Sequence, residues 1–328
     1  MGTKERPAVL VVAQAIQNKA RGRSENLLIM KSETMQIPFT KMHGAGNDFV
    51  VLDNRSKQLP LDSRFISRIS DRHFGVGADQ VLIVENPDYA THDFKYRIFN
   101  ADGQEVQQCG NGARCFAQYV FEKGLTPKTT LKVETRAGVI APQLKGPNLV
   151  RVDMGPAAFA PTSLPFQSEG LPTRQVGGLT QYQLQVDSGV SGEKLWVSVA
   201  SMGNPHVVIQ CDQPASDELV DRLGPVLESH PRFPERVNVG FMSVVDRNRA
   251  QLRVYERGVG ETLACGTGAC AAAVCGMKLG LLANRVEMVK RGGVLVIEWA
   301  GESEDHVYMT GPAETVFEGV YVYELGRN

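Results

Sequence analysis

The sequence predicts an α+β protein of two pseudo-symmetric domains, each with a mixed or antiparallel β-sheet wrapped around a central helix. Two observations predict this fold. One local signature occurs twice, and in each half short strand-like runs surround one long helix that follows the signature. A repeat of such long period indicates two similar domains and not a solenoid of short units. The 328 residues are enough for two cores of this kind.

The repeated signature places a cysteine at the start of a glycine-punctuated helix. The first segment reads Cys109-Gly-Asn-Gly-Ala and the second reads Cys265-Gly-Thr-Gly-Ala, 156 residues later. A Gly-Asn pair precedes each cysteine, with its asparagine at Asn47 and Asn204. Further positions match at the same offset of 156: Arg97 and Arg253, Asn100 and Glu256, and Glu105 and Glu261. Two facing domains would place one thiol on each side of a shared cleft.

The first half is expected to contain short strands and two helices. A strand-like segment begins after Met35, and apolar runs predict further strands at 49–53, 80–85, 95–100, 130–135, 139–144 and 149–154. Asp62 predicts the start of a helix that runs to about His73 and stops at Gly75. A helix is predicted over 110–123, because apolar residues recur there at helical spacing before Gly124.

The second half repeats this order. Strands are predicted at 196–200, 207–210, 237–245 and 251–256, followed by a hairpin over 286–299 and more strands over 306–325. Helices are predicted over 217–229 and over 266–279, where Gly280 is the stop.

Proline residues between 156 and 172 indicate a loop-rich join, which is the predicted domain boundary. The first domain is expected to comprise residues 35–153 plus about 311–328, and the second residues 154–310. Residues 1–34 are polar and basic in part and are expected to form a loose N-terminal extension.

Composition excludes several classes of function. The net charge of −1 provides no basic surplus for nucleic acid or an anionic membrane, and no apolar run approaches the length of a bilayer span. The six cysteines form no C-x-x-C pair and have no histidine pair at metal-ligand spacing nearby, so neither a disulfide scaffold nor a metal site is expected. Free thiols indicate a reducing compartment, and we expect a cytoplasmic protein.

The two repeated cysteines are the predicted chemical groups. A thiol at a helix N-terminus lies near unpaired N–H groups and the positive end of the helix dipole, which favours the thiolate. The same N–H groups can hold a substrate carboxylate. A lone cysteine there would more often be a small buried residue, and a lone asparagine is usually a turn residue, but two cysteines in matching repeats favour chemistry. Cys115 and Cys270 are expected only to pack inside their helices.

These motifs together resemble those of the diaminopimelate epimerase family, from about Met35 to the C-terminus. The matching segments are Lys41-Met-His-Gly-Ala-Gly-Asn-Asp-Phe49, Asn100-Ala-Asp-Gly, Cys109-Gly-Asn-Gly-Ala-Arg114, Gly203-Asn-Pro-His206, Val237-Asn-Val-Gly240, Glu256-Arg-Gly258 and Ala264-Cys-Gly-Thr-Gly268. The resemblance implies that family's fold and a cofactor-independent epimerase that interconverts LL- and meso-diaminopimelate in lysine and cell-wall synthesis. It also implies a homodimer.

The resemblance also implies a role for each matched residue. Cys109 would be the proton donor and Cys265 the proton acceptor in the LL to meso direction. The reacting end of the substrate would be held by Gly110, Asn111, Gly266 and Thr267, with help from Asn47 and Gln80. The distal amino-acid centre would be read by Asn100, Asn204, Asn238, Glu256 and Arg257. His206 and Glu256 would tune the thiols; from the residues alone, both could equally be surface polar groups.

Three rival interpretations remain at this stage. A proline or hydroxyproline racemase-like enzyme would use the same two-thiol chemistry, but it needs no reader of a distal carboxylate such as Arg257. A PhzF-like isomerase would lack the cysteine pair. A thiol redox or metal-binding module is the alternative from another class. The chain departs from the family at Phe317, where a tyrosine is common, so a dimer contact through that hydroxyl is not expected.

Overall fold

The structure is a computed structural model that describes residues 34–107, 109–187, 189 and 192–325. The described residues divide into a larger compact unit, residues 36–321, and a smaller one that contains residues 34–35 and 322–325. The predicted extension over residues 1–34 lies outside the described residues, apart from Thr34. The four α-helices of the described part all lie in the larger unit.

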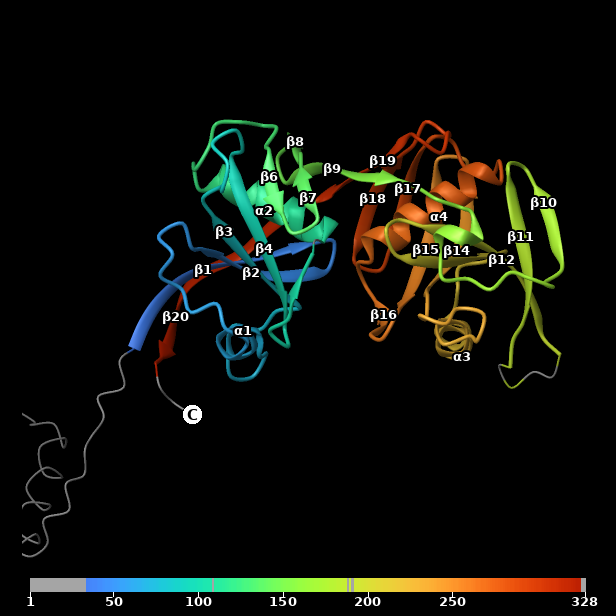
Figure 1. The fold of residues 1–328 in the computed structure, drawn as a ribbon, viewed down its shortest axis with the longest axis horizontal. Coiled ribbons are helices and arrows are strands. Elements are labelled where there is room, and N and C mark those ends of the chain that lie inside the picture. The colour runs from blue at the N-terminus through green and yellow to red at the C-terminus, as the bar shows by residue number, and fades with distance from the viewer. Residues whose placement is uncertain (1–33, 108, 188, 190–191, 326–328) are drawn as a thin grey trace, which may run out of the picture. The chain divides into compact units, whose positions relative to one another are not determined.

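A first sheet of eight strands surrounds helix α2 (Gly110–Glu122) (Figure 1). Its strand order is β20 (Glu314–Glu324), β1 (Thr34–Gly44), β2 (Asn47–Asp53), β3 (Gln80–Glu85), β4 (Phe94–Asn100), β6 (Val133–Thr135) and β7 (Gly138–Ile140), with β5 (Glu105–Val106) paired to β4. The pairs β2–β3 and β4–β6 are parallel, whereas β1–β2, β3–β4 and β6–β7 are antiparallel. The sheet is therefore mixed.

A second sheet of twelve strands surrounds helix α4 (Gly266–Lys278) (Figure 1). Its order is β10 (Thr173–Val176), β11 (Leu179–Gln185), β12 (Lys194–Ser201), β13 (Pro205–Cys211), β14 (Asn238–Asp246), β15 (Arg249–Glu256), β17 (Arg285–Lys290), β18 (Gly293–Glu298), β19 (His306–Pro312), β9 (Leu149–Pro156) and β8 (Gln143–Gly146), with β16 (Gly260–Thr262) paired to β15. Here too the sheet is mixed, because β13–β14 and β15–β17 are parallel.

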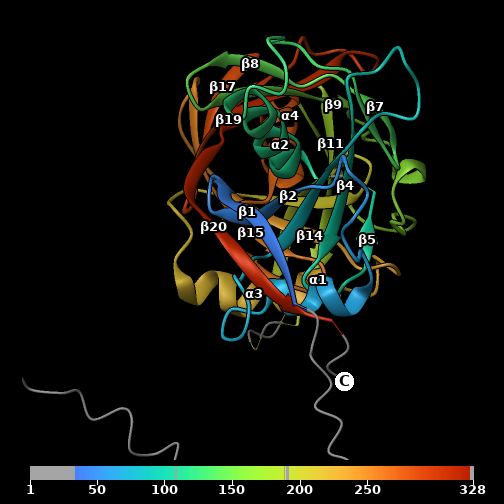
Figure 2. The same cartoon turned by 90° about the vertical axis from the view of Figure 1, so that its left-hand side faces the viewer.

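The central helices are buried on nearly all sides. Every residue of α2 from Asn111 to Val120 is buried, and so is every residue of α4 from Gly268 to Gly276. A helix surrounded by protein needs small or apolar side chains all round, and α4 supplies alanines and cysteines there. The two helices contact each other, and they overlap in the view of Figure 2. The cores of the two halves therefore meet at these helices.

The two halves repeat the same local structure. In each, a helix follows the first strand of a parallel pair: α1 (Ser63–Ser70) after β2, and α3 (Asp217–Glu228) after β13. Each half also has an equivalent bidentate ion pair. Arg97 binds Glu105 through two 2.9 Å hydrogen bonds, and Arg253 binds Glu261 through two of 2.7 Å. The predicted α+β fold with a repeated sheet and central helix is confirmed.

Three predicted elements are wrong in detail. The helix predicted over 62–73 ends at Ser70, because the Asp71 side chain instead accepts from the backbone N–H groups of His73 and Phe74, both at 2.7 Å. The predicted strand over 139–144 is two strands, β7 and β8, that separate at Pro142 and join different sheets; proline has no N–H for a ladder. The strand predicted over 130–135 begins only at Val133.

The predicted domain boundary between residues 153 and 154 falls inside β9. This strand pairs with β19 in the second sheet, yet its Val150 and Val152 pack into the core cluster around α2. Independent folding of 35–153 plus about 311–328, and of 154–310, stays a prediction.

Gly112 on α2 offers a stability test of the packing around the first central helix. A Cβ at this position would overlap the Tyr96 hydroxyl and lie 3.2 Å from the methyl groups of Leu82 and Ile98. We expect Gly112→Ala to destabilise the protein by about 1–3 kcal/mol, since overpacking exceeds the gain of under ~1 kcal/mol in helix propensity. Thermal unfolding followed by circular dichroism measures this.

Gly240→Ala on β14 is the control, because the atom nearest to its added Cβ lies at an ordinary 3.5 Å. Equal melting temperatures for Gly112→Ala and the wild type would contradict the tight packing of α2 on β3 and β4.

Candidate active site

Both repeated cysteines are the N-cap residues of the central helices. Cys109 caps α2 and Cys265 caps α4. The glycine after each allows a close approach to Met309 on β19. A Cβ at Gly110 would lie 2.7 Å from the Met309 Cε atom, and a Cβ at Gly266 would lie 3.2 Å from its Sδ atom. The two helix starts therefore pack against one common side chain.

The side chain of Asn111 joins the two cysteine segments directly. Its Nδ2 donates to the backbone carbonyl of Ala264 at 2.6 Å, which is the residue before Cys265. The same Nδ2 lies 3.4 Å from Asn47 Oδ1. Asn111 is 4% exposed, so these hydrogen bonds are shielded from water. The N-terminal turn of α2 is thus anchored beside the second thiol.

The asparagine of each repeated Gly-Asn pair contacts the first turn of a cysteine helix. Asn47 Oδ1 accepts from Asn111 at 3.4 Å, and Asn204 Nδ2 donates to Thr267 Oγ1, also at 3.4 Å. Asn111 and Thr267 are both the second residue of their helices. Thr267 Oγ1 lies 3.7 Å from the sulfur of Cys265, and the N–H of Gly268 donates to that sulfur at 3.4 Å. The Cys109 thiol donates to Asn47 Oδ1 at 3.7 Å.

His206 contacts the second thiol site through Asn204. Its Nε2 lies 3.0 Å from Asn204 Oδ1, and the ring is 1% exposed. Burial, with the positive charge of Arg257 as a smaller cause, lowers the pKa of His206 to about 3. The imidazole is therefore neutral at neutral pH and acts as a hydrogen-bonding group there.

The remaining predicted residues lie at strand ends on the corresponding edge of each sheet. Gln80 at the start of β3 pairs in register with Asn100 at the end of β4, and its Nε2 donates to Asn100 Oδ1 at 2.9 Å. In the second half, Asn238 starts β14 and Glu256 ends β15. Asn238 Oδ1 accepts from the backbone N–H of Arg257 at 2.9 Å. Each half therefore carries polar side chains at equivalent strand ends.

Glu256 and Arg257 differ in their surroundings. The Thr262 hydroxyl donates to Glu256 Oε1, and the Glu256 carboxylate interacts with the Cys265 thiol. Arg257 is exposed and donates from Nη1 to the backbone carbonyl of Glu235 at 3.2 Å. Among the residues that the structure describes, no carboxylate forms an ion pair with Arg257. Its guanidinium therefore keeps donors for an external anion.

The pKa values of both thiols move in the direction opposite to the one expected for a helix N-terminus. Burial raises the pKa of Cys109, although the N–H groups of Gly112 and Asn111 act against it. Burial raises the pKa of Cys265 well above its usual value, and the negative charge of Glu256 adds to that rise. The N-terminal donors are present as predicted, but desolvation outweighs them.

Three charged residues at the site were missed by the sequence reasoning. Lys290 at the end of β17 is 8% exposed and donates to the backbone carbonyl of Cys265 at 3.3 Å. Burial lowers the pKa of Lys290 to about 8. Arg114 on α2 is fully buried and donates to the carbonyl of Pro312 at 3.2 Å. Asp79 accepts from Asn47 Nδ2 at 3.0 Å. Arg114 belongs to the matched motif, but nothing in the local sequence signals the other two.

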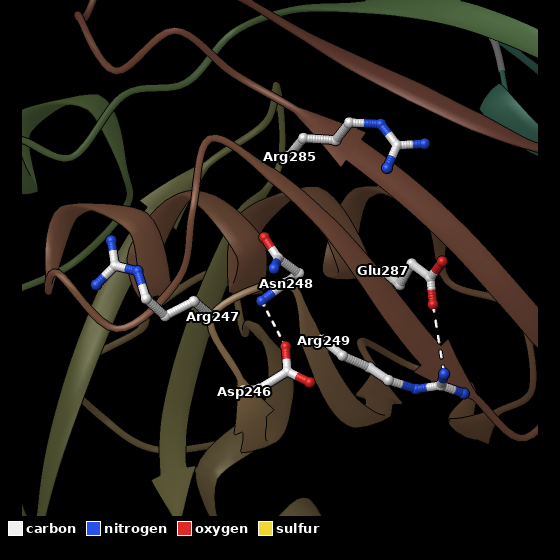
Figure 3. Close-up of a pocket in the computed structure, with 6 residues that line it drawn as sticks. All are labelled: Asp246, Arg247, Asn248, Arg249, Arg285 and Glu287. Carbon is white, nitrogen blue, oxygen red and sulfur yellow. Dashed lines mark hydrogen bonds and ion pairs between the residues drawn. The ribbon is translucent and has the colours of Figure 1, made fainter.

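Other features of the described residues lie away from these contacts. A surface hollow of about 480 Å³ is lined by Asp246, Arg247, Asn248, Arg249, Arg285 and Glu287, and contains neither thiol (Figure 3). Within the described ranges, no three metal-ligating side chains cluster, and no helix has the length and apolar character to cross a bilayer. All six cysteines are free thiols.

Comparison with known proteins agrees with the motifs. The model of the family "Diaminopimelate epimerase" matches residues 39–160 and 198–316. The diaminopimelate epimerase of Acidovorax ebreus is 54% identical over 87% of this chain and 97% of its own length. The chain is an isomerase of the epimerase class. It belongs to the diaminopimelate epimerase family.

Solved structures with less sequence similarity share the fold. A phenazine biosynthesis protein of the PhzF family from Bacillus anthracis superimposes with a TM-score of 0.61 at 16% identity, covering 87% of this chain and 99% of its own. A hydroxyproline epimerase from Agrobacterium vitis superimposes with a TM-score of 0.60 at 15% identity, covering 90% and 94%. At such identities the likeness shows the fold alone.

Glu256 provides a test of the electrostatics at the second thiol. Because its negative charge raises the pKa of Cys265, Glu256→Gln should lower that pKa and increase the thiolate fraction near pH 8. We expect alkylation of Cys265 by iodoacetamide to become severalfold faster, as measured by peptide mass spectrometry.

Glu287→Gln on β17 is the control, since Glu287 pairs with Arg249 at the hollow of Figure 3. A Cys265 rate in Glu256→Gln that equals the wild-type rate, or falls below it, would remove Glu256 from the electrostatics of the thiol.

Proposed function

We propose that this chain interconverts LL- and meso-2,6-diaminopimelate by cofactor-independent proton transfer at the α-carbon, with one thiol on each face of that carbon. The observation that carries the proposal is the hydrogen bond from Asn111 to Ala264, since it brings the N-terminus of the Cys109 helix to the residue beside Cys265. Two equivalent helix N-termini that meet in a buried site suit one small anionic substrate.

The reaction follows from the two thiols and the donors around them. In the LL to meso direction, the thiolate of Cys265 removes the α-proton, and the Cys109 thiol delivers its proton to the opposite face. Cys265 then carries a proton and Cys109 is a thiolate, so the pair must exchange protons before the next turnover in the same direction. Because the two groups act as a pair, their titrations are coupled.

Stabilisation of the carbanion is the largest demand on the site. An amino-acid α-proton is very weakly acidic, and preorganised donors in a dry site supply the needed stabilisation where the charge develops. Backbone N–H groups at the starts of α2 and α4, over Gly110 to Asn111 and Gly266 to Thr267, would bind the carboxylate beside the reacting carbon. Asn47 and Gln80 would help to orient the reacting end.

Recognition of the distal amino-acid centre is assigned to the strand-end residues. Arg257 would pair with the distal carboxylate, and the amides of Asn100, Asn204 and Asn238 with the Glu256 carboxylate would read the distal polar groups. The free donors of Arg257 support this assignment. A racemase of proline needs no such reader, which disfavours that alternative.

We also propose a cytoplasmic homodimer. β20 is at the edge of the first sheet and exposes Val316, Phe317 and Val320, each about half accessible to solvent. An edge strand with exposed apolar side chains is suited to pairing with a second copy. Phe317 packs edge-on against Phe39 with ring centroids 5.8 Å apart, so the ring is held in place without the tyrosine hydroxyl.

The proposed activity predicts a specific conversion. Purified protein without added cofactor should convert LL-diaminopimelate to a mixture with the meso form, as measured by chiral chromatography. L-proline and trans-4-hydroxy-L-proline should remain unchanged under the same conditions. Cys109→Ala and Cys265→Ala should each lose activity by at least about a thousandfold, because one face loses its acid or base.

Cys115→Ala is the matched control, because Cys115 lies buried within α2 and burial raises its pKa to about 12. It should retain activity. Turnover close to wild type in either Cys109→Ala or Cys265→Ala, or racemisation of proline, would overturn the proposal.

The proposed role of Arg257 predicts that it gives specificity for a substrate with a second carboxylate. A guanidinium can bind a carboxylate through two parallel hydrogen bonds, whereas a lysine ammonium cannot. We expect Arg257→Lys to reduce kcat/KM for diaminopimelate by about 10–100-fold, mainly through KM, which steady-state kinetics would show. Arg232→Lys is the control, since Arg232 also donates to backbone carbonyls, those of Gln167 and Glu169. Unchanged efficiency in Arg257→Lys would exclude Arg257 from the substrate site.

A further inference from the structure

Asn47 makes different contacts with the two ends of its side-chain amide. Its Nδ2 donates to Asp79 Oδ2 at 3.0 Å. Its Oδ1 accepts from Asn111 Nδ2 at 3.4 Å and from the Cys109 thiol at 3.7 Å. The amide therefore lies between a carboxylate on one side and the first thiol on the other.

The carboxylate decides which way this amide faces. An ionised carboxylate can only accept hydrogen bonds, so it must face the NH₂ end of Asn47, and the carbonyl oxygen then faces the thiol. We propose that Asp79 is a positioning residue of the epimerase site, whose carboxylate holds the Asn47 amide with Oδ1 toward Cys109. The inference rests on the proposed function only in its kinetic test.

Asp79 is itself held by several groups. Its Oδ1 accepts from Arg72 Nη2 at 2.7 Å, and its Oδ2 also accepts from the backbone N–H of Asp48 at 3.2 Å. Its own backbone N–H donates to Asp48 Oδ1 at 2.8 Å, and Arg72 binds both oxygens of Asp48 at 2.8 Å. Lys41 adds an ion pair to Asp48 at 2.7 Å. This network fixes the carboxylate without using the donors of Asn47.

The second half has no equivalent of this carboxylate. The registers of β2 on β3 and β13 on β14 align Gln80 with Asn238, so Val237 stands at the position of Asp79 and Pro205 at that of Asp48. There Asn204 turns the other way, with Oδ1 toward His206 and Nδ2 toward Thr267. The two related asparagines thus present opposite ends toward their cysteine helices.

This asymmetry has a chemical consequence. An acceptor beside a thiol stabilises its S–H form, whereas donors stabilise the thiolate. At Cys109 the acceptor is Asn47 Oδ1, which opposes the N–H donors of the helix start. At Cys265 the acceptor is the Glu256 carboxylate, beside the donor Gly268 N–H. By setting the Asn47 amide, Asp79 stabilises the S–H form of Cys109, which is the state of a proton donor.

A double-mutant cycle tests the coupling between Asp79 and Asn47. Asp79→Ala should lower kcat/KM by about tenfold, and Asn47→Ala by at least as much. If Asp79 acts through Asn47, the double variant should be no worse than Asn47→Ala alone. A loss of kcat/KM in the double variant that equals the product of the two single losses would overturn the proposal. Asp53→Ala is the matched control, because Asp53 is an arginine-paired aspartate at the opposite end of β2 and should leave kcat/KM unchanged.

The alkylation rate of Cys109 distinguishes an effect of the Asn47 orientation from an effect of the Asp79 charge. Its measurement requires no turnover of diaminopimelate. In Asp79→Ala the amide of Asn47 is released, so the thiol loses its acceptor and Cys109 should react with iodoacetamide at least about threefold faster near pH 8. Asp79→Asn removes the charge but keeps an oxygen that can accept from Asn47, so its Cys109 rate should stay near that of the wild type. The charged groups that face Cys109, Arg114 on α2 and Glu256 on β15, are the same in both variants.

Equal acceleration in Asp79→Ala and Asp79→Asn would show a charge effect and overturn the proposal, as would no acceleration in Asp79→Ala. If Cys109→Ala and Cys265→Ala stay active, the proposed function fails and the alkylation result still decides the orientation of Asn47.

Discussion

The hydrogen bond from Asn111 to the carbonyl of Ala264 is the contact on which the site depends. It is short at 2.6 Å and buried, and it links the first turn of one central helix to the residue before the second thiol. Breaking it would leave a buried carbonyl without its partner, which is costly in a region of low dielectric. The shared packing of Gly110 and Gly266 against Met309 holds the same junction from another side. Two repeated halves thereby become one site.

Burial at this junction controls the chemistry in two opposing ways. It raises the pKa of both thiols, so an unliganded site holds thiolate at a cost. It also excludes water, which strengthens every N–H group directed at a developing negative charge. The N–H donors at the N-termini of α2 and α4 therefore contribute most when an anion is bound to them. The proposed reaction can therefore proceed with cysteines whose pKa values are raised in the empty site.

Apolar residues at helical spacing and the glycine stops were enough to predict both central helices within one residue of their ends, and the repeat placed both cysteines at their starts. The end of α1 was mispredicted because of a local contact, in which the Asp71 side chain accepts from the N–H groups of His73 and Phe74. The other errors come from distant contacts, since β7 and β8 separate because they join different sheets. The orientation of the Asn47 amide could not be predicted from the sequence either, because its partner Asp79 lies 32 residues away in the chain. Lys290 looks like a surface lysine in sequence, and only the fold buries it.

The central claim is that two thiols serve opposite faces of one carbon. The most direct measurement is the placement of deuterium when LL-diaminopimelate reacts in D₂O to low conversion, followed by mass spectrometry of the separated stereoisomers. With two bases, the meso product should carry one deuterium at the inverted carbon, while recovered LL substrate should carry almost none. Equal early labelling of substrate and product would show that a single group exchanges its proton with solvent and acts on both faces, and would contradict the account.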